Sequence, residues 1–126
     1  KEYEKNTEFD DVDYAKIKRA HDVISKLAKG CVNIKKEADF MMYVPYNKIV
    51  DGDIDDKILI QGVCDLIIEY EDSITIVDYK FSHLSIESLK QKYQEQLNIY
   101  KMAVESAYGK KVEHVFIYSI NTGELG

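Results

Sequence analysis

Apolar residues repeat at helical spacing in the first part of the chain. The repeat follows a polar start and ends just before Gly30, a residue type that commonly follows the last turn of a helix. It predicts an amphipathic helix with an apolar stripe made of Tyr14, Ile17, His21, Ile24, Leu27 and Ala28. His21 thus stands on an apolar stripe, where a histidine is either a hydrogen-bonded core residue or a metal ligand.

Three later segments have the composition of β-strands. Residues 33–46, 57–70 and 73–81 are rich in β-branched, aromatic and other apolar residues. The first segment ends near Pro45, the only proline, which cannot donate to a ladder and marks an edge or an exit. The short polar connection at 71–72 can turn the second strand back onto the third. The three segments therefore predict a meander.

A second helix and a last strand complete the pattern. The helix is predicted from Ser85, a good N-cap, to Tyr108, with Gly109 placed to end it. Its apolar face carries one amide, Gln96, which either bonds a polar group in a cleft or lies in solvent at the edge of the stripe. Residues 112–120 are almost continuously apolar, as expected for a strand buried on both faces. The predicted class is α/β, with the order α-β-β-β-α-β.

The candidate chemistry lies on the second and third strands. Side chains two apart on a strand share a face, so Asp78 and Lys80 point together, and the tight turn can bring Asp65 opposite Asp78. Buried carboxylates are costly unless a counter-charge or a metal compensates them. Oxygen ligands suit Mg²⁺ or Mn²⁺, which could activate water to attack a phosphodiester while Lys80 orients the hydroxide. The alternative is a simple Asp78–Lys80 salt bridge at a strand edge.

The first hairpin carries two acidic features, of which one has two possible interpretations and the other has one. Glu37 could face a cleft, or it could lie in solvent at the start of a strand. The acidic segment 51–56 resembles a calcium loop only superficially, because the required glycine and the last glutamate are missing. We interpret it as a solvated hairpin connection.

Composition is that of an ordinary globular domain, with 126 residues, 45% of them hydrophobic and 32% charged. We expect one domain. No apolar stretch approaches the ~20 residues that span a bilayer, so no membrane contact is expected and the cytoplasm is the default location. Cys31 and Cys64 are too few for a zinc or iron-sulfur motif.

The net charge of −6 is the main objection to a nucleic-acid substrate. Several of the acids belong to the predicted site and to segment 51–56. Basic residues do cluster, either lining a track for a DNA strand or lying on solvated helix faces. These clusters are Lys16-x-Lys18-Arg19, Lys35-Lys36, Lys90-x-Lys92 and Lys110-Lys111. We expect weak intrinsic affinity for DNA.

Three motifs occur in a fixed order. They are Gly62-Val63-Cys64-Asp65, Asp78-Tyr79-Lys80 and Tyr93-x-x-Gln96-Leu97-x-x-Tyr100, accompanied by Glu37-Ala38-Asp39-Phe40 and by residues 118–124. Together they resemble the nuclease domain of the RecB and AddA helicase-nucleases, within the PD-(D/E)xK superfamily. The likeness covers residues 35–124 and is closest to the C-terminal nuclease domain of AddA. It implies a restriction-endonuclease-like fold with a mixed central sheet.

The resemblance also implies roles for the strand residues. Asp65 and Asp78 would bind the metal, and the carbonyl of Tyr79 would supply another ligand. Lys80 would be the catalytic lysine. The metal would be Mg²⁺, with Mn²⁺ able to substitute.

Further roles are implied for the helices. Gln96 and Tyr100 would belong to the helix motif that borders the site. His21 matches the place of a histidine that reaches the metal from the first helix. The family usually shows Gly-Thr shortly before that histidine, whereas this chain has Lys18-Arg19-Ala20.

The resemblance implies a Mg²⁺-dependent deoxyribonuclease, the exonuclease part of an ATP-dependent helicase-nuclease in double-strand-break repair and recombination. The chain starts at Lys1 and has no Walker motif, so we expect residues 1–126 to be a single nuclease domain, the C-terminal fragment of a longer protein. DNA would be the substrate, and the partner would be an AddB-like protein in the full complex. Two alternatives are a module that no longer cuts and serves DNA binding or subunit docking, and a stand-alone phage or mobile-element nuclease.

Overall fold

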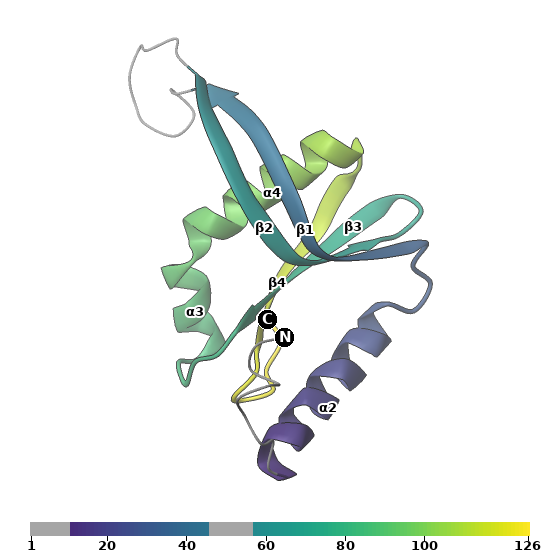
Figure 1. Ribbon diagram of the computed structural model, residues 1–126, viewed down its shortest axis with the longest axis vertical. Helices are drawn as coiled ribbons and strands as arrows, with labels where there is room; N and C mark the ends of the chain where they lie inside the picture. Colours follow the sequence, from purple (N-terminus) through teal and green to yellow (C-terminus); the bar gives the residue numbers. More distant parts are fainter. Residues whose placement is uncertain (1–10, 46–56) are drawn as a thin grey trace, which may run out of the picture.

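A computed structural model describes residues 11–45 and 57–126, in which a four-stranded sheet carries helices on both faces (Figure 1). In chain order the elements are α2 (Asp11–Leu27), β1 (Asn33–Pro45), β2 (Lys57–Glu69), β3 (Ser73–Lys80), α3 (Ile86–Lys92), α4 (Gln94–Tyr108) and β4 (Lys111–Ser119). The predicted α/β class is confirmed, and so is the order of elements except that the second helix is divided. The predicted loop at 51–56 lies outside the described residues. None of the described helices is long and apolar enough to cross a bilayer.

The sheet has the order β1-β2-β3-β4 and is mixed. β1, β2 and β3 pair antiparallel, which confirms the predicted meander, and β4 pairs parallel with β3. β2 pairs with β3 only from Leu66 to Glu69, while it pairs with β1 along almost its whole length. The β1–β2 ribbon therefore diverges from β3 and projects beyond the rest of the sheet (Figure 1).

Helix α2 packs on the sheet through apolar side chains of its C-terminal half. Four half-buried side chains contact the core on this face, namely Ala20, Val23, Ile24 and Leu27. Tyr14, Ile17 and His21 are exposed, so the predicted stripe is wrong at these three positions, the first two of which lie in the first half of the helix. There the helix is held by polar contacts instead, because Arg19 Nη2 donates to the carbonyl of Ile120 at 3.2 Å.

The second predicted helix breaks at Tyr93, so the prediction of one continuous helix is wrong. Ser85 caps α3 as expected, with its hydroxyl accepting the Ser88 N–H at 3.2 Å. Gly109 ends α4 with a φ of 64°, a left-handed conformation that suits glycine. Tyr93 has φ −108° and ψ 15°, which ends α3 and lets α4 leave in a new direction (Figure 1). The sequence offers no glycine or proline at this break.

Two apolar clusters cover the two faces of the sheet. Ile74 and Ile76 of β3 enter the cluster under α3 and α4, whereas Val77 enters the cluster under α2, as period-two alternation requires. β4 is continuously buried only from Ile117 to Ser119, and in its first half Val112 is buried while Glu113 and His114 are exposed. The prediction that this strand is buried along its length is therefore wrong, because β4 is an edge strand.

The Ile76→Ala substitution tests this assignment of the core. Ile76 is fully buried, so the substitution should lower the free energy of unfolding by about 2–5 kcal/mol. Ile34→Ala is the control, because Ile34 is 38% exposed and should cost less than about 1 kcal/mol. Urea denaturation measures both values, and equal losses would contradict the packing described.

Candidate active site

Asp78 and Lys80 project from one face of β3 toward α3 and α4. They share this face with Ile74 and Ile76, which pack against α4. Lys80 Nζ lies 3.0 Å from Asp78 Oδ2, and Asp78 is only 3% exposed. The pair is therefore an internal ion pair and not a solvated bridge at a strand edge.

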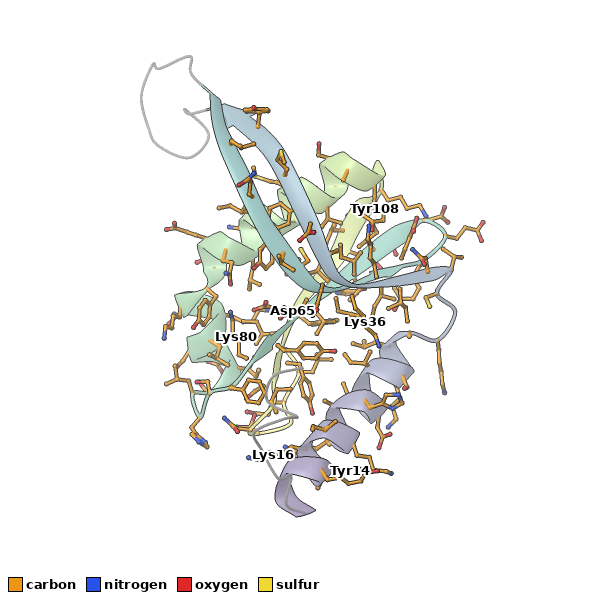
Figure 2. The ribbon with its side chains drawn as sticks, viewed as in Figure 1. Tyr14, Lys16, Lys36, Asp65, Lys80 and Tyr108 are labelled. Atoms are coloured by element: carbon orange, nitrogen blue, oxygen red, sulfur yellow. The ribbon has the colours of Figure 1, made fainter. Side chains whose placement is uncertain are left out.

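Asp65 stands where β2 separates from β3. The β2–β3 ladder ends at Leu66, and one further step in the same register places Asp65 opposite Asp78. The backbone N–H of Tyr79 donates to Asp65 Oδ2 at 2.9 Å and fixes this carboxylate beside β3. Asp65 and Lys80 lie in the same part of the molecule (Figure 2). The structure thus brings both predicted aspartates and the lysine together.

The carboxyl of Asp78 is expensive to ionise. Burial raises its pKa, the adjacent Lys80 ammonium lowers it, and both the charge of Asp65 and a hydrogen bond with Asp65 raise it again. The net direction is upward. Two carboxyls that interact in this way resist carrying two negative charges unless another cation is present.

One oxygen of this carboxyl lacks a hydrogen-bond donor. Asp78 Oδ2 is buried and accepts no hydrogen bond from any described residue. Its charge partner is the Lys80 ammonium, 3.0 Å away, which lowers the pKa of Asp78. A cation shared with Asp65 would satisfy this oxygen, and carboxylate oxygens are the ligands that Mg²⁺ and Mn²⁺ prefer. The residues present therefore fit a divalent ion.

The amide of Gln96 faces the site and does not lie in solvent, which decides between the two interpretations of this residue. This side chain is half-buried, and its Oε1 accepts a hydrogen bond from Lys80 Nζ at 3.3 Å. The same ammonium lies 3.8 Å from the centre of the Tyr93 ring. The amide therefore faces the site, and α4 contributes directly to the surroundings of Lys80.

Tyr100 closes the apolar side of the site. Its ring meets the ring of Phe40 edge to face, with centroids 5.4 Å apart. Burial, followed by the charges of Asp78, Cys64 and Asp65, raises the pKa of Tyr100 to about 12. The hydroxyl therefore stays protonated at neutral pH and is available as a hydrogen-bond donor.

The other two predicted ligands are placed differently. His21 is exposed on α2, and no described hydrogen bond or ion pair connects it with the carboxylates. Tyr79 contributes its backbone to the site, while its ring packs against Tyr118 with centroids 6.2 Å apart. Within residues 11–45 and 57–126, no three histidine, cysteine or acidic side chains form a ready metal cluster. The whole proposed ligand set, Asp65 and Asp78 included, stays a prediction.

Glu37 occupies an irregular position in β1. Its φ of 49° is left-handed, which is uncommon for a residue other than glycine. The flanking pairs, Lys36 with Leu66 and Ala38 with Cys64, place it level with Asp65 in the register. The side chain of Glu37 is exposed.

Sequence reasoning missed the part that Tyr93 plays in the site. Its position three residues before Gln96 was a signal, because residues so spaced on a helix share a face. That signal favoured packing against the core, which Tyr93 also does. Its contact with the Lys80 ammonium depends on the break between α3 and α4. No glycine or proline at this place predicts that break.

The mixed sheet, the two facing aspartates and the adjacent lysine define a class of metal-dependent nuclease folds. A family model described as the PD-(D/E)XK nuclease superfamily matches residues 2–124. The chain belongs to this superfamily.

Individual relatives specify the branch of the family. The chain is 39% identical over 107 residues to the A subunit of the ATP-dependent helicase/nuclease of Ligilactobacillus salivarius, covering 82% of this chain and 9% of that protein. It is 36% identical over 111 residues to the corresponding protein of Ruminiclostridium cellulolyticum, with the same two coverages. The resemblance to the AddA-type nuclease is confirmed, and the chain spans about 9% of the length of these relatives.

Asp78→Asn tests the electrostatic strain at this site. The fold raises the pKa of Asp78, so the folded state favours the neutral carboxyl. The contribution of this neutral carboxyl to the free energy of unfolding is full at low pH and is lost as the pH rises through the folded pKa. Asparagine stays neutral, so without divalent ions the variant should gain thermal stability over the wild type as the pH rises from about 4. Calorimetry in EDTA measures this gain.

The matched control is Asp72→Asn, in the exposed β2–β3 turn, which should show no such gain. A difference between Asp78→Asn and the wild type that does not change with pH would contradict the raised pKa.

Proposed function

We propose that this chain hydrolyses DNA phosphodiester bonds in a Mg²⁺-dependent reaction that Mn²⁺ also supports. The observation that carries the proposal is the buried carboxyl of Asp78, which lies opposite Asp65 in the strand register and pairs with the Lys80 ammonium at 3.0 Å. Membership of a nuclease superfamily supports the same activity. A bound divalent ion would supply Lewis-acid activation of water and neutralisation of phosphate charge.

The residues of the chain divide the remaining work. Asp65 and Asp78 hold the ion, with the Tyr79 carbonyl as a further proposed ligand. Lys80 places its ammonium next to these carboxylates, where it can orient the attacking water and stabilise negative charge on the phosphate. Gln96 holds that ammonium in place.

Two residues at the edge of the site have smaller proposed roles. The protonated hydroxyl of Tyr100 is available to donate a hydrogen bond to a site carboxylate or to a water. We also propose His21 as a metal ligand, which requires a shift of α2, because this helix covers the face of the sheet opposite to Asp78 and Lys80.

The wider role is also part of the proposal. The relatives are named as parts of an ATP-dependent helicase/nuclease, and the matched segment covers 9% of each. We infer an exonuclease module of a cytoplasmic, ATP-dependent helicase-nuclease for double-strand-break repair, with an AddB-like partner protein. In such an assembly other segments deliver the DNA strand, which agrees with the net charge of −6.

Cleavage of linear DNA tests the activity directly. With Mg²⁺ the wild type should degrade the substrate, and Asp78→Ala and Lys80→Met should each slow cleavage by about 10²-fold or more. Asp72→Asn, in the exposed turn, is the control and should cut like the wild type. Gel analysis of end-labelled single- and double-stranded DNA also reports strand preference and polarity.

Equal degradation by the wild type and Asp78→Ala would assign the activity to a contaminant. If the wild type bound DNA but none of these proteins cut it, the result would favour the alternative of a module that no longer cuts.

Metal binding is tested without turnover. Mn²⁺ at about 100 times its dissociation constant should stabilise the wild type by about 2.7 kcal/mol, because an ion bound only by the folded state shifts the equilibrium. Asp65→Asn and Asp78→Asn should each abolish this stabilisation, and His21→Ala should reduce it if His21 is a ligand. Thermal unfolding across a Mn²⁺ titration measures all four proteins, and equal stabilisation of the wild type and Asp78→Asn would contradict the site.

A further inference from the structure

The Lys80 ammonium is enclosed by three different groups. Asp78 Oδ2 lies 3.0 Å away, Gln96 Oε1 lies 3.3 Å away, and the Tyr93 ring lies with its centre 3.8 Å from Nζ. The carboxylate and the amide each offer an oxygen, whereas the ring offers its negative π face. The Tyr93 ring therefore contacts the ammonium on a side where neither of these two oxygens lies.

The backbone at Tyr93 is fixed firmly enough to serve this purpose. Its N–H donates to the Leu89 carbonyl at 3.0 Å, and its own carbonyl accepts the Leu97 N–H at 3.0 Å. The residue is shared between the end of α3 and the start of α4, and its half-buried ring packs against the core cluster beneath them. The break between the two helices thus fixes where the ring stands.

The ring itself makes the contact with Lys80. No described hydrogen bond involves the Tyr93 hydroxyl, so the aromatic face is the part of this side chain that interacts with the site. A second ammonium, that of Lys92, lies 5.4 Å from the same ring centre. Lys92 is exposed and its ammonium is the more distant of the two, so the closer contact of the ring is with Lys80.

We propose that Tyr93 is a positioning residue for Lys80, and that its π face keeps the ammonium between Asp78 and Gln96. This inference rests on the proposed function, in which Lys80 acts on the phosphate and the attacking water. A lysine side chain has many rotamers, and a ring on one side removes those that carry the ammonium away from the carboxylates.

Kinetics with matched substitutions at position 93 test the proposal. Tyr93→Leu keeps an apolar side chain but removes the π face, and it should lower kcat by about 2- to 30-fold, the range that cation-π energies imply, with little change in KM. Tyr93→Phe should recover most of that loss. Replacement by trifluorinated phenylalanine keeps the ring shape but weakens its negative face, so it should resemble Tyr93→Leu.

The control substitution is Tyr108→Leu. Tyr108 is also half-buried against the same core cluster, but it lies at the far end of α4 from Lys80 (Figure 2). It should lower stability without the kcat effect. If Tyr93→Leu and Tyr108→Leu changed kcat equally, or if the fluorinated ring behaved like phenylalanine, Tyr93 would be a packing residue only and the proposal would be overturned.

Nuclear magnetic resonance gives a readout that does not depend on cleavage. The ε-methylene protons of Lys80 should be shifted upfield by the ring in the wild type and in Tyr93→Phe, and should return to the position of exposed lysines in Tyr93→Leu. An unshifted wild-type signal overturns the proposal even if the protein cuts DNA. A shifted signal in a protein that does not cut would retain the placement of Lys80 by Tyr93 while rejecting the proposed function.

Discussion

The burial of the Asp78 carboxylate is the constraint on which the site depends. Its pKa is raised by burial and by Asp65, and Lys80 supplies only one positive charge against two carboxyls. One oxygen is left without a donor among the described residues. Such an arrangement lowers stability unless a further cation joins it, and this is typical of sites where stability is given up for activity.

The fold creates this arrangement by letting two strands separate. β2 leaves β3 just before the carboxylates would become an ordinary cross-strand pair, and the Tyr79 N–H keeps Asp65 turned toward β3. On the other side, the break between α3 and α4 brings two side chains, Tyr93 and Gln96, against the Lys80 ammonium. All of these groups stand on strands or helix ends, which hold a reacting geometry better than a loop does.

Local periodicity predicted the parts of this site that lie within one strand. Alternation along β3 placed Asp78 and Lys80 on one face, and the short turn placed Asp65 nearby. Features that depend on how elements pack were not predictable in this way. The break at Tyr93 has no marker residue, and the exposure of Tyr14 depends on how α2 crosses the sheet.

Anomalous diffraction from crystals soaked in Mn²⁺ tests the central claim most directly. We predict a peak between the carboxylates of Asp65 and Asp78, at about 2.1 Å from an oxygen of each, and the additional ligands seen there would decide the roles of Tyr79 and His21. At a saturating concentration of Mn²⁺, a peak bound elsewhere, or no peak between these two side chains, would contradict this claim.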